Sequence, residues 1–308
     1  MDMAKKKDRP IGQAQHRVSQ VYQKGFGYRD QQGKWWISAL DISKQEEMQR
    51  ENRMKTVQLS IKKATVAHGE FDMFGMPDIE QSFLEDVFGK MESMYPAILK
   101  QIAETGTMTD NYRARILEYM ASLLVRSKRF RRLMKEIIDS PDGRAYVRTL
   151  CLWVESDKDK DNITNAAFLL APEQRLNFVC GQMMHYLAMT LGTFEFRIIE
   201  TPDHHGFATC DDPVVVWTID RPHTILSVET EVFFPLSREY ALHLSHPSAK
   251  HANNPLLRNL PHSVVSKGTE EIRHIFRTMT RIAADQYVFF TRKVEIDEPL
   301  EVDEGQAA

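Results

Sequence analysis

The sequence predicts an α+β fold in which a central helical bundle layer packs on a mostly antiparallel sheet formed from N-terminal and C-terminal segments. Between about residues 78 and 190, apolar residues recur every three or four positions, which is the period of an amphipathic helix. Before and after this region, short segments alternate apolar and polar residues, as half-buried strands do. Because the strand-like segments lie at both ends of the chain, the sheet has to be assembled from both ends.

One domain is expected to account for nearly the whole chain. Its 308 residues suit one large domain or two small ones, and they contain no internal repeats and no low-complexity block. We expect a single α+β domain over residues 15–296. Residues 1–14 are polar and residues 297–308 are acidic, so both ends are expected to be disordered.

The N-terminal elements are a short helix and a hairpin. Val18, Val21 and Tyr22 are spaced for one side of a helix that Gly25 ends. Residues 27–40 predict a hairpin whose turn lies at 30–33. Residues 41–77 have no strong period.

The helical layer begins near Pro77. One long helix is expected to about residue 102, with Pro96 either kinking or dividing it. A second helix is expected over 110–139, begun by a cap at Thr109 or Asp110 and stopped by Pro141. Further helical stretches are predicted at 142–155 and 172–191. The charged segment 155–162 is interpreted as a solvated loop.

The C-terminal third reads mainly as strands. Val214–Trp217 is β-branched and aromatic, and segment 287–290 forms a final strand. Between them a loop over 246–266 and a helix over 270–285 are expected. The remaining strands are predicted at 194–199, 230–237 and 240–244.

Composition limits the classes of partner and compartment. A net charge of −3 gives no global attraction to nucleic acid or anionic membrane. The basic run Lys128–Arg132 leaves a local nucleic-acid or phosphate patch open, although such a run is more often a solvated face. Three distant cysteines argue for a reducing compartment, and no signal peptide or membrane-length apolar run is present. We therefore expect a cytoplasmic protein that is not bound to membranes.

Two charged residues interrupt the apolar stripes of the predicted helices. Glu80 points with the apolar face of the first helix, although an early glutamate also suits the positive helix start. Arg126 lies on the stripe of the second helix, and a guanidinium there needs an anionic partner. Glu80 and the Asp211–Asp212 pair are the expected partners.

The paired carboxylates stand in the stretch Phe207–Trp217, between two apolar segments. Pro213 stiffens the backbone beside Asp211 and Asp212. Two close carboxylates repel, so one of them is expected to require a cation or a proton. The alternative interpretation is an ordinary tight turn.

Four stretches resemble the motifs of a bacterial domain-of-unknown-function family, DUF-4238. They are His16–Phe26, Ile79-Glu80 with Met91-Glu92, Phe207–Val214 and Phe234–Ser237. By this resemblance the family's polar positions fall on His16, Glu80, Glu92, Arg126 and Asp211. The chain departs from the family pattern at Ser19, Cys210 and Asp212, where the family has proline, serine and asparagine. The resemblance implies no activity.

Two hypotheses of function follow. The first is a hydrolase of a phosphodiester or similar ester, of a toxin or defence type, with a catalytic group of His16, Glu80, Arg126, Asp211 and Asp212. Glu80, Glu92 and Asp211 would hold a divalent metal that activates water, and Arg126 would bind the substrate. The second is a non-catalytic ligand- or protein-binding module in which the same groups form a structural buried ion network.

Overall fold

The computed structural model describes residues 14–51, 56–74, 80–151, 153–201, 206–218, 227–249 and 254–291. Within them, helices and antiparallel sheets confirm the predicted α+β class. The ends predicted to be disordered, 1–14 and 297–308, lie outside the described residues, apart from Ala14, the first residue of β1.

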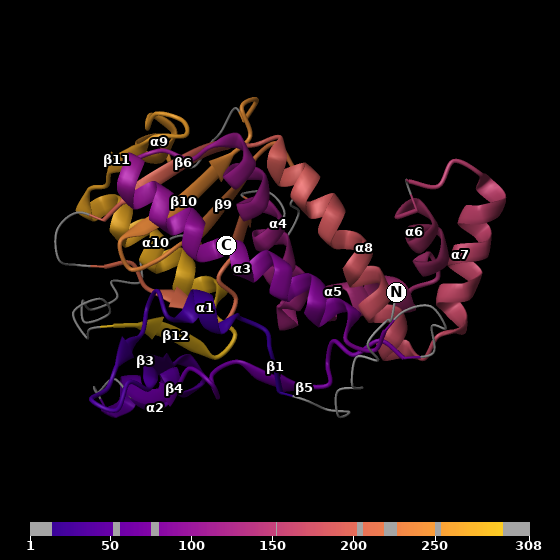
Figure 1. Ribbon diagram of the computed structural model, residues 1–308, viewed down its shortest axis with the longest axis horizontal. Coiled ribbons are helices and arrows are strands. Elements are labelled where there is room, and N and C mark those ends of the chain that lie inside the picture. Colours follow the sequence, from indigo (N-terminus) through magenta and orange to yellow (C-terminus); the bar gives the residue numbers. More distant parts are fainter. Residues whose placement is uncertain are drawn as a thin grey trace, which may run out of the picture.

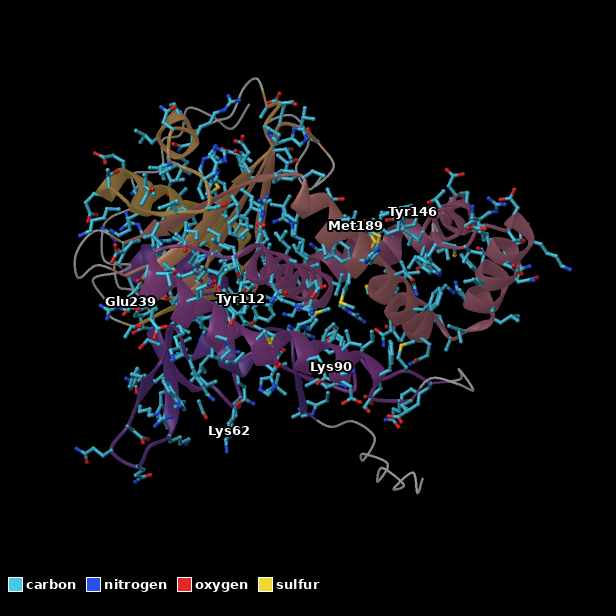
Figure 2. All side chains as sticks on the ribbon, turned by 45° about the horizontal axis from the view of Figure 1, so that its top comes forward. Lys62, Lys90, Tyr112, Tyr146, Met189 and Glu239 are labelled. Carbon is cyan, nitrogen blue, oxygen red and sulfur yellow. The ribbon has the colours of Figure 1, made fainter. Side chains whose placement is uncertain are left out.

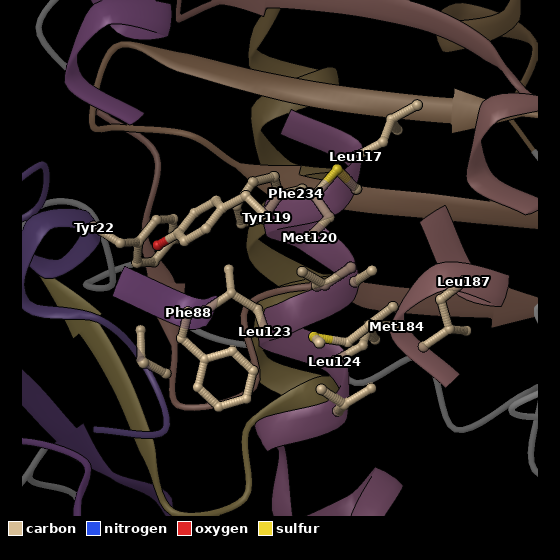
Figure 3. Close-up of a cluster of buried hydrophobic side chains, with 14 of the residues drawn as sticks. Tyr22, Phe88, Leu117, Tyr119, Met120, Leu123, Leu124, Met184, Leu187 and Phe234 are labelled. Carbon is tan, nitrogen blue, oxygen red and sulfur yellow. The ribbon is translucent and has the colours of Figure 1, made fainter. Parts of the chain in front are cut away.

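Three long helices form the central layer: α3 (Phe83–Thr105), α4 (Asp110–Arg126) and α8 (Pro172–Gly192). Helix α4 packs against both of the others, and its second half is buried on all sides. Figure 3 shows Leu124 of α4 beside Met184 and Leu187 of α8. Helix α3 runs through Pro96 without dividing. Helix α4 is therefore the middle helix of this layer (Figure 1).

The helix predicted over 110–139 is two helices, α4 and α5 (Lys128–Asp139), so that prediction was wrong at Ser127. Ser127 is extended, with ψ 143°, and its hydroxyl oxygen accepts a hydrogen bond from Phe130 N at 3.2 Å. A serine at this position satisfies an N–H that the new helix leaves unpaired. The chain can therefore turn between the two helices.

Two helices form the end of the molecule away from the sheets, α6 (Gly143–Thr149) and α7 (Asp157–Leu169) (Figure 1). The loop predicted over 155–162 is wrong, because most of it belongs to α7. Ser156 caps the helix, and Asp157 and Asp159 lie in its first turn. Carboxylates there stabilise the positive end of a helix.

A five-stranded sheet has the order β11-β6-β10-β9-β8, and only β11 and β6 run parallel. Alternate residues of its strands face opposite layers. Phe234 packs with Tyr119 of α4, whereas Phe233 meets Phe276 of α10. The helix α9 and the strand β11 both fall in the segment predicted as a loop. The bounds are β6 Glu195–Glu200, β8 Val215–Thr218, β9 Thr230–Pro235, β10 Tyr240–Ser245, β11 Val265–Lys267, α9 Pro255–Arg258 and α10 Glu270–Ala283.

A second sheet joins both ends of the chain, as predicted, in the order β2-β3-β12-β7 with β4 also on β3. The predicted hairpin over 27–40 is present, with Gly33 in its turn at φ 76°. The single predicted sheet is thus two sheets and a ribbon of β1 and β5. The bounds are β1 Ala14–His16, β2 Tyr28–Arg29, β3 Trp35–Asp41, a 3-10 turn Ile42–Lys44, α2 Gln45–Glu51, β4 Thr56–Ser60, β5 Val66–His68, β7 Thr209–Cys210 and β12 Tyr287–Phe290.

The short helix α1 (Gln20–Gln23) joins these parts. The Tyr22 hydroxyl donates to Pro235 O at 2.6 Å and lies 2.6 Å from Thr209 Oγ1. Ser19, which caps α1, lies 2.5 Å from the Tyr119 hydroxyl of α4. Three of the stretches that carry the family resemblance, His16–Phe26, Phe207–Val214 and Phe234–Ser237, therefore meet in the core, where Figure 3 shows Tyr22 and Phe234. No helix in the described part of the chain is long and apolar enough to cross a bilayer.

Candidate functional site

Arg126 is the centre of a buried ion network at the C-terminal end of α4. Its side chain is almost fully buried, and Nη1 lies 2.7 Å from Glu92 Oε1. The same nitrogen donates to the carbonyl oxygen of His16, while Nε and Nη2 donate to the carbonyl and hydroxyl oxygens of Ser122. The guanidinium also lies 4.5 Å from the ring centre of Phe88. Glu92, rather than the expected Glu80 or Asp211–Asp212 pair, is therefore the partner of Arg126.

His16 lies beside this network and is partly buried. Its Nε2 is 3.2 Å from Lys62 O and 3.4 Å from Gln20 Nε2. Burial lowers the pKa of His16 and Arg126 adds to the effect, whereas the hydrogen bond to Lys62 and the charge of Glu92 oppose it. The structure therefore brings together three of the predicted residues: His16, Glu92 and Arg126.

Glu80 does not lie in the core as predicted. It precedes α3, whose cap is Ser82, and its exposed side chain stands outside the helix. Its carbonyl oxygen accepts a hydrogen bond from Phe83 N. The spacing of apolar residues places Glu80 wrongly because α3 begins only at Phe83, six residues after Pro77. Glu80 therefore lies outside the helix and is not part of its apolar stripe.

Asp211 fixes the turn between α10 and β12. Its Oδ1 accepts from Asp285 N at 2.9 Å, and its Oδ2 accepts from Gln286 N at 2.9 Å and Tyr287 N at 3.1 Å. Burial raises the pKa of Asp211, and these three hydrogen bonds oppose that effect. Both oxygens of this carboxylate are thus used to hold backbone.

The expected metal group of Glu80, Glu92 and Asp211 is not assembled. Glu92 is paired with Arg126, Glu80 is exposed before α3, and Asp211 holds backbone N–H groups. Across the described ranges, no three His, Cys, Asp or Glu side chains are arranged to hold a metal ion. The structure therefore does not place these three residues together as ligands of one ion.

Asp212 belongs to a second cluster, at the junction of α4 and α5. It is buried, and its Oδ1 has no hydrogen-bond partner among the described residues. Burial, reinforced by the charge of Asp211, raises the pKa of Asp212 to about 7; Arg129 and a hydrogen bond with Ser127 lower it, and Asp285 raises it. Two adjacent carboxylates are expected to leave one of them in need of a proton or a cation, and Asp212 meets that description.

A pocket of about 500 Å³ opens beside Asp212, between α5, α8, α6 and β8; we call it the α5 pocket. Tyr146, labelled in Figure 2, forms part of its wall, and its hydroxyl lies 3.4 Å from Met183 Sδ. Arg132 and Glu136 lie at the exposed rim. The other lining residues are Leu124, Ser127, Arg129, Phe130, Leu133, Met134, Ile137, Leu187, Asp212, Val214, Val215, Val216 and Ala283.

The basic run Lys128–Arg132 is not a uniform solvated face. Lys128 pairs with Asp285 at 2.6 Å. Arg131 is buried, with Nε 3.2 Å from Glu70 Oε1 and Nη2 donating to Asn177 Oδ1 at 2.9 Å. Arg129 and Arg132 line the α5 pocket instead. A nucleic-acid patch would therefore have at most part of this run available.

The pocket wall was not identified from the sequence as a site. The sequence predicts no more than a helix over 172–191 and a single helix over 110–139. The available signal was Ser127, because a serine followed by a new apolar stripe is an N-cap pattern. A break there turns Phe130, Leu133 and Ile137 of α5 towards the pocket.

Comparisons with known proteins place the chain in a family but supply no chemistry. Neither the curated proteins nor the solved structures include a match. The model of one family, described as "Protein of unknown function (DUF4238)", matches residues 14–294. That range covers most of the chain and includes both clusters and the α1 junction. This chain therefore belongs to the DUF4238 family.

Proposed function

We propose that this protein binds a small, largely apolar ligand in the α5 pocket. The observation that carries the proposal is the buried Asp212 carboxylate among the largely apolar residues that line a pocket of about 500 Å³. Ligand sites typically have ~300–1,000 Å³, mostly apolar walls and a few polar groups that orient the ligand. The α5 pocket has this composition.

The contrast with the Arg126 network supports the assignment. At least four of the five guanidinium N–H donors of Arg126 are used by Glu92, His16 and Ser122. A guanidinium whose donors are nearly all used is typical of a structural ion network, which is the second hypothesis drawn from the sequence. Asp212, in contrast, has an oxygen without a hydrogen-bond partner, and such a buried polar atom costs about 1–3 kcal/mol. A ligand donor would remove that cost.

The test is a fragment screen by ligand-observed NMR on the wild type and two variants. Leu133→Trp fills the pocket with an indole and should abolish the fragment signals. Leu99→Trp enlarges a partly buried leucine of α3 that does not line the pocket, so its signals should persist. Fragments that bind all three proteins equally, or none of them, would contradict the proposal.

Hydrolysis of a phosphodiester or similar ester at the same pocket is a second candidate. It is favoured by Asp212, whose pKa of about 7 suits a general base at neutral pH. Ionised Asp212 would take the proton of an attacking water, and Arg129 would face the anionic ester. Assays with model phosphodiesters and carboxylic esters, run with chelator and then with magnesium or manganese, test this. Activity that survives Asp212→Asn would reject it.

A further inference from the structure

The charges around Asp212 favour a cation inside the α5 pocket. Asp211 and Asp285 both raise the pKa of Asp212, which means that the local potential is made more negative by them. Arg129 and the Ser127 hydroxyl oppose this, but burial and Asp211 outweigh them. Lys128, the other nearby base, is paired with Asp285. Three carboxylates, Asp211, Asp212 and Asp285, therefore face two bases, Arg129 and Lys128, at this end of the pocket.

Most of the remaining lining residues of the pocket are apolar. Phe130, Leu133 and Ile137 come from one face of α5, and Val214 and Val215 come from the segment that enters β8. The remaining charged pair, Arg132 and Glu136, stands one helical turn apart in solvent and carries both signs. The rim therefore does not select one sign of charge, whereas the buried end does.

Three kinds of polar ligand group can be compared by how each would interact with the Asp212 carboxylate. A ligand carboxylate would be repelled by Asp212 and Asp211. A hydroxyl would donate a hydrogen bond to the carboxylate but would leave its negative charge uncompensated. An ammonium would donate a hydrogen bond and also supply a positive charge, and hydrogen bonds between charged partners are the stronger kind. The walls then require that the remainder of the molecule be hydrocarbon.

We propose that the ligand of the α5 pocket is an apolar amine, with its ammonium group beside the Asp212 carboxylate and its hydrocarbon body between α5, α8 and β8. This inference rests on the proposed binding function and adds the chemical class of the ligand. It requires no metal and no covalent step.

The test is a titration with three probes of equal chain length: n-hexylamine, n-hexanol and n-hexanoate. At pH 8 a primary amine is protonated, since the lysine amine has a pKa of about 10.4. Hexylamine should bind at least about tenfold more tightly than hexanol, because a charged hydrogen bond contributes ~1.5–3 kcal/mol. Hexanoate should bind most weakly.

Two substitutions locate the contact. Asp212→Asn should reduce the affinity for hexylamine to that for hexanol and leave hexanol unchanged. Glu136→Gln removes a carboxylate from the rim and should preserve the preference for the amine. The wild-type series already decides the sign of the preference, so the test stands if a variant does not fold.

The outcomes separate the two proposals. Tightest binding of hexanoate, or equal binding of amine and alcohol, would overturn the amine assignment and leave ligand binding intact. A preference for the amine that survives Asp212→Asn would also overturn it. Failure of all three probes to bind would overturn the proposed function itself.

Discussion

At the scale of single residues, neighbouring carboxylates have opposite roles. Asp211 accepts three backbone hydrogen bonds, whereas Asp212 has a buried oxygen with no hydrogen-bond partner among the described residues. The sequence could predict that the two carboxylates differ, because two adjacent buried charges are costly. It could not predict which one is satisfied, since the N–H groups that decide it are 74 to 76 residues away.

Asp212 should make folding stability depend on pH. Its pKa is about 7 when folded and 3.8 ordinarily, so the penalty begins as pH rises through 3.8 and is complete above about 7. Relative to wild type, Asp212→Asn should gain roughly 2–3 kcal/mol between pH 5 and pH 8. Urea unfolding at the two pH values measures this. Asp211→Asn serves as the control and should destabilise at both, and a pH-independent difference for Asp212→Asn would refute the assignment.

Glu92 should be important for stability. Glu92→Leu leaves the buried guanidinium of Arg126 without a counter-charge, and breaking a buried pair typically costs about 3–5 kcal/mol. Because the Glu92 side chain is 25% exposed, water entry should place the loss at the lower end of that range. Denaturant unfolding gives the value.

The control is another ion-paired glutamate of the same helix. Glu104 lies 3.7 Å from Lys100, and both side chains are mostly exposed. Glu104→Leu should change stability by less than about 1 kcal/mol, as exposed pairs do. Similar losses for the two variants would mean that Arg126 does not depend on Glu92.

At the scale of elements, the sequence predicted most helices and strands but missed two helix ends. Four polar residues, Arg126 to Arg129, interrupt the apolar spacing around Ser127, and the prediction of one helix over 110–139 passes over this gap. The acidic stretch after Ser156 resembled a loop because its carboxylates were counted as solvated charge rather than as first-turn residues. In both cases a capping serine was the available signal.

Ser127→Ala tests the role of this junction. The variant loses the cap of α5 and the hydrogen bond to Asp212, so stability should fall by about 1–2 kcal/mol. Ser93→Ala removes an exposed hydroxyl that bonds within α3 and should have almost no effect. Thermal and urea unfolding compare the two, and equal stability of both variants would show that Ser127 does not hold the junction.

At the scale of the whole molecule, the predicted site residues fall into two clusters. His16, Glu92 and Arg126 meet on one side of the α4 end, while Asp212 meets Ser127 and the α5 pocket. The sequence placed Arg126 and the aspartates in one site because it could not show that the chain turns between Arg126 and Ser127. Strand pairing was equally hidden, since β12 joins β3 and β7 from distant parts of the chain.

Ligand binding in the α5 pocket is the central claim, and the most direct measurement locates a bound ligand. Methyl-labelled methionine NMR with n-hexylamine suits this, because Met134 and Met183 line the pocket, whereas Met120 is buried in the core and does not. The account predicts shift changes and ligand contacts at Met134 and Met183 and none at Met120. Contacts confined to other methionines, or no change at saturating amine, would contradict it.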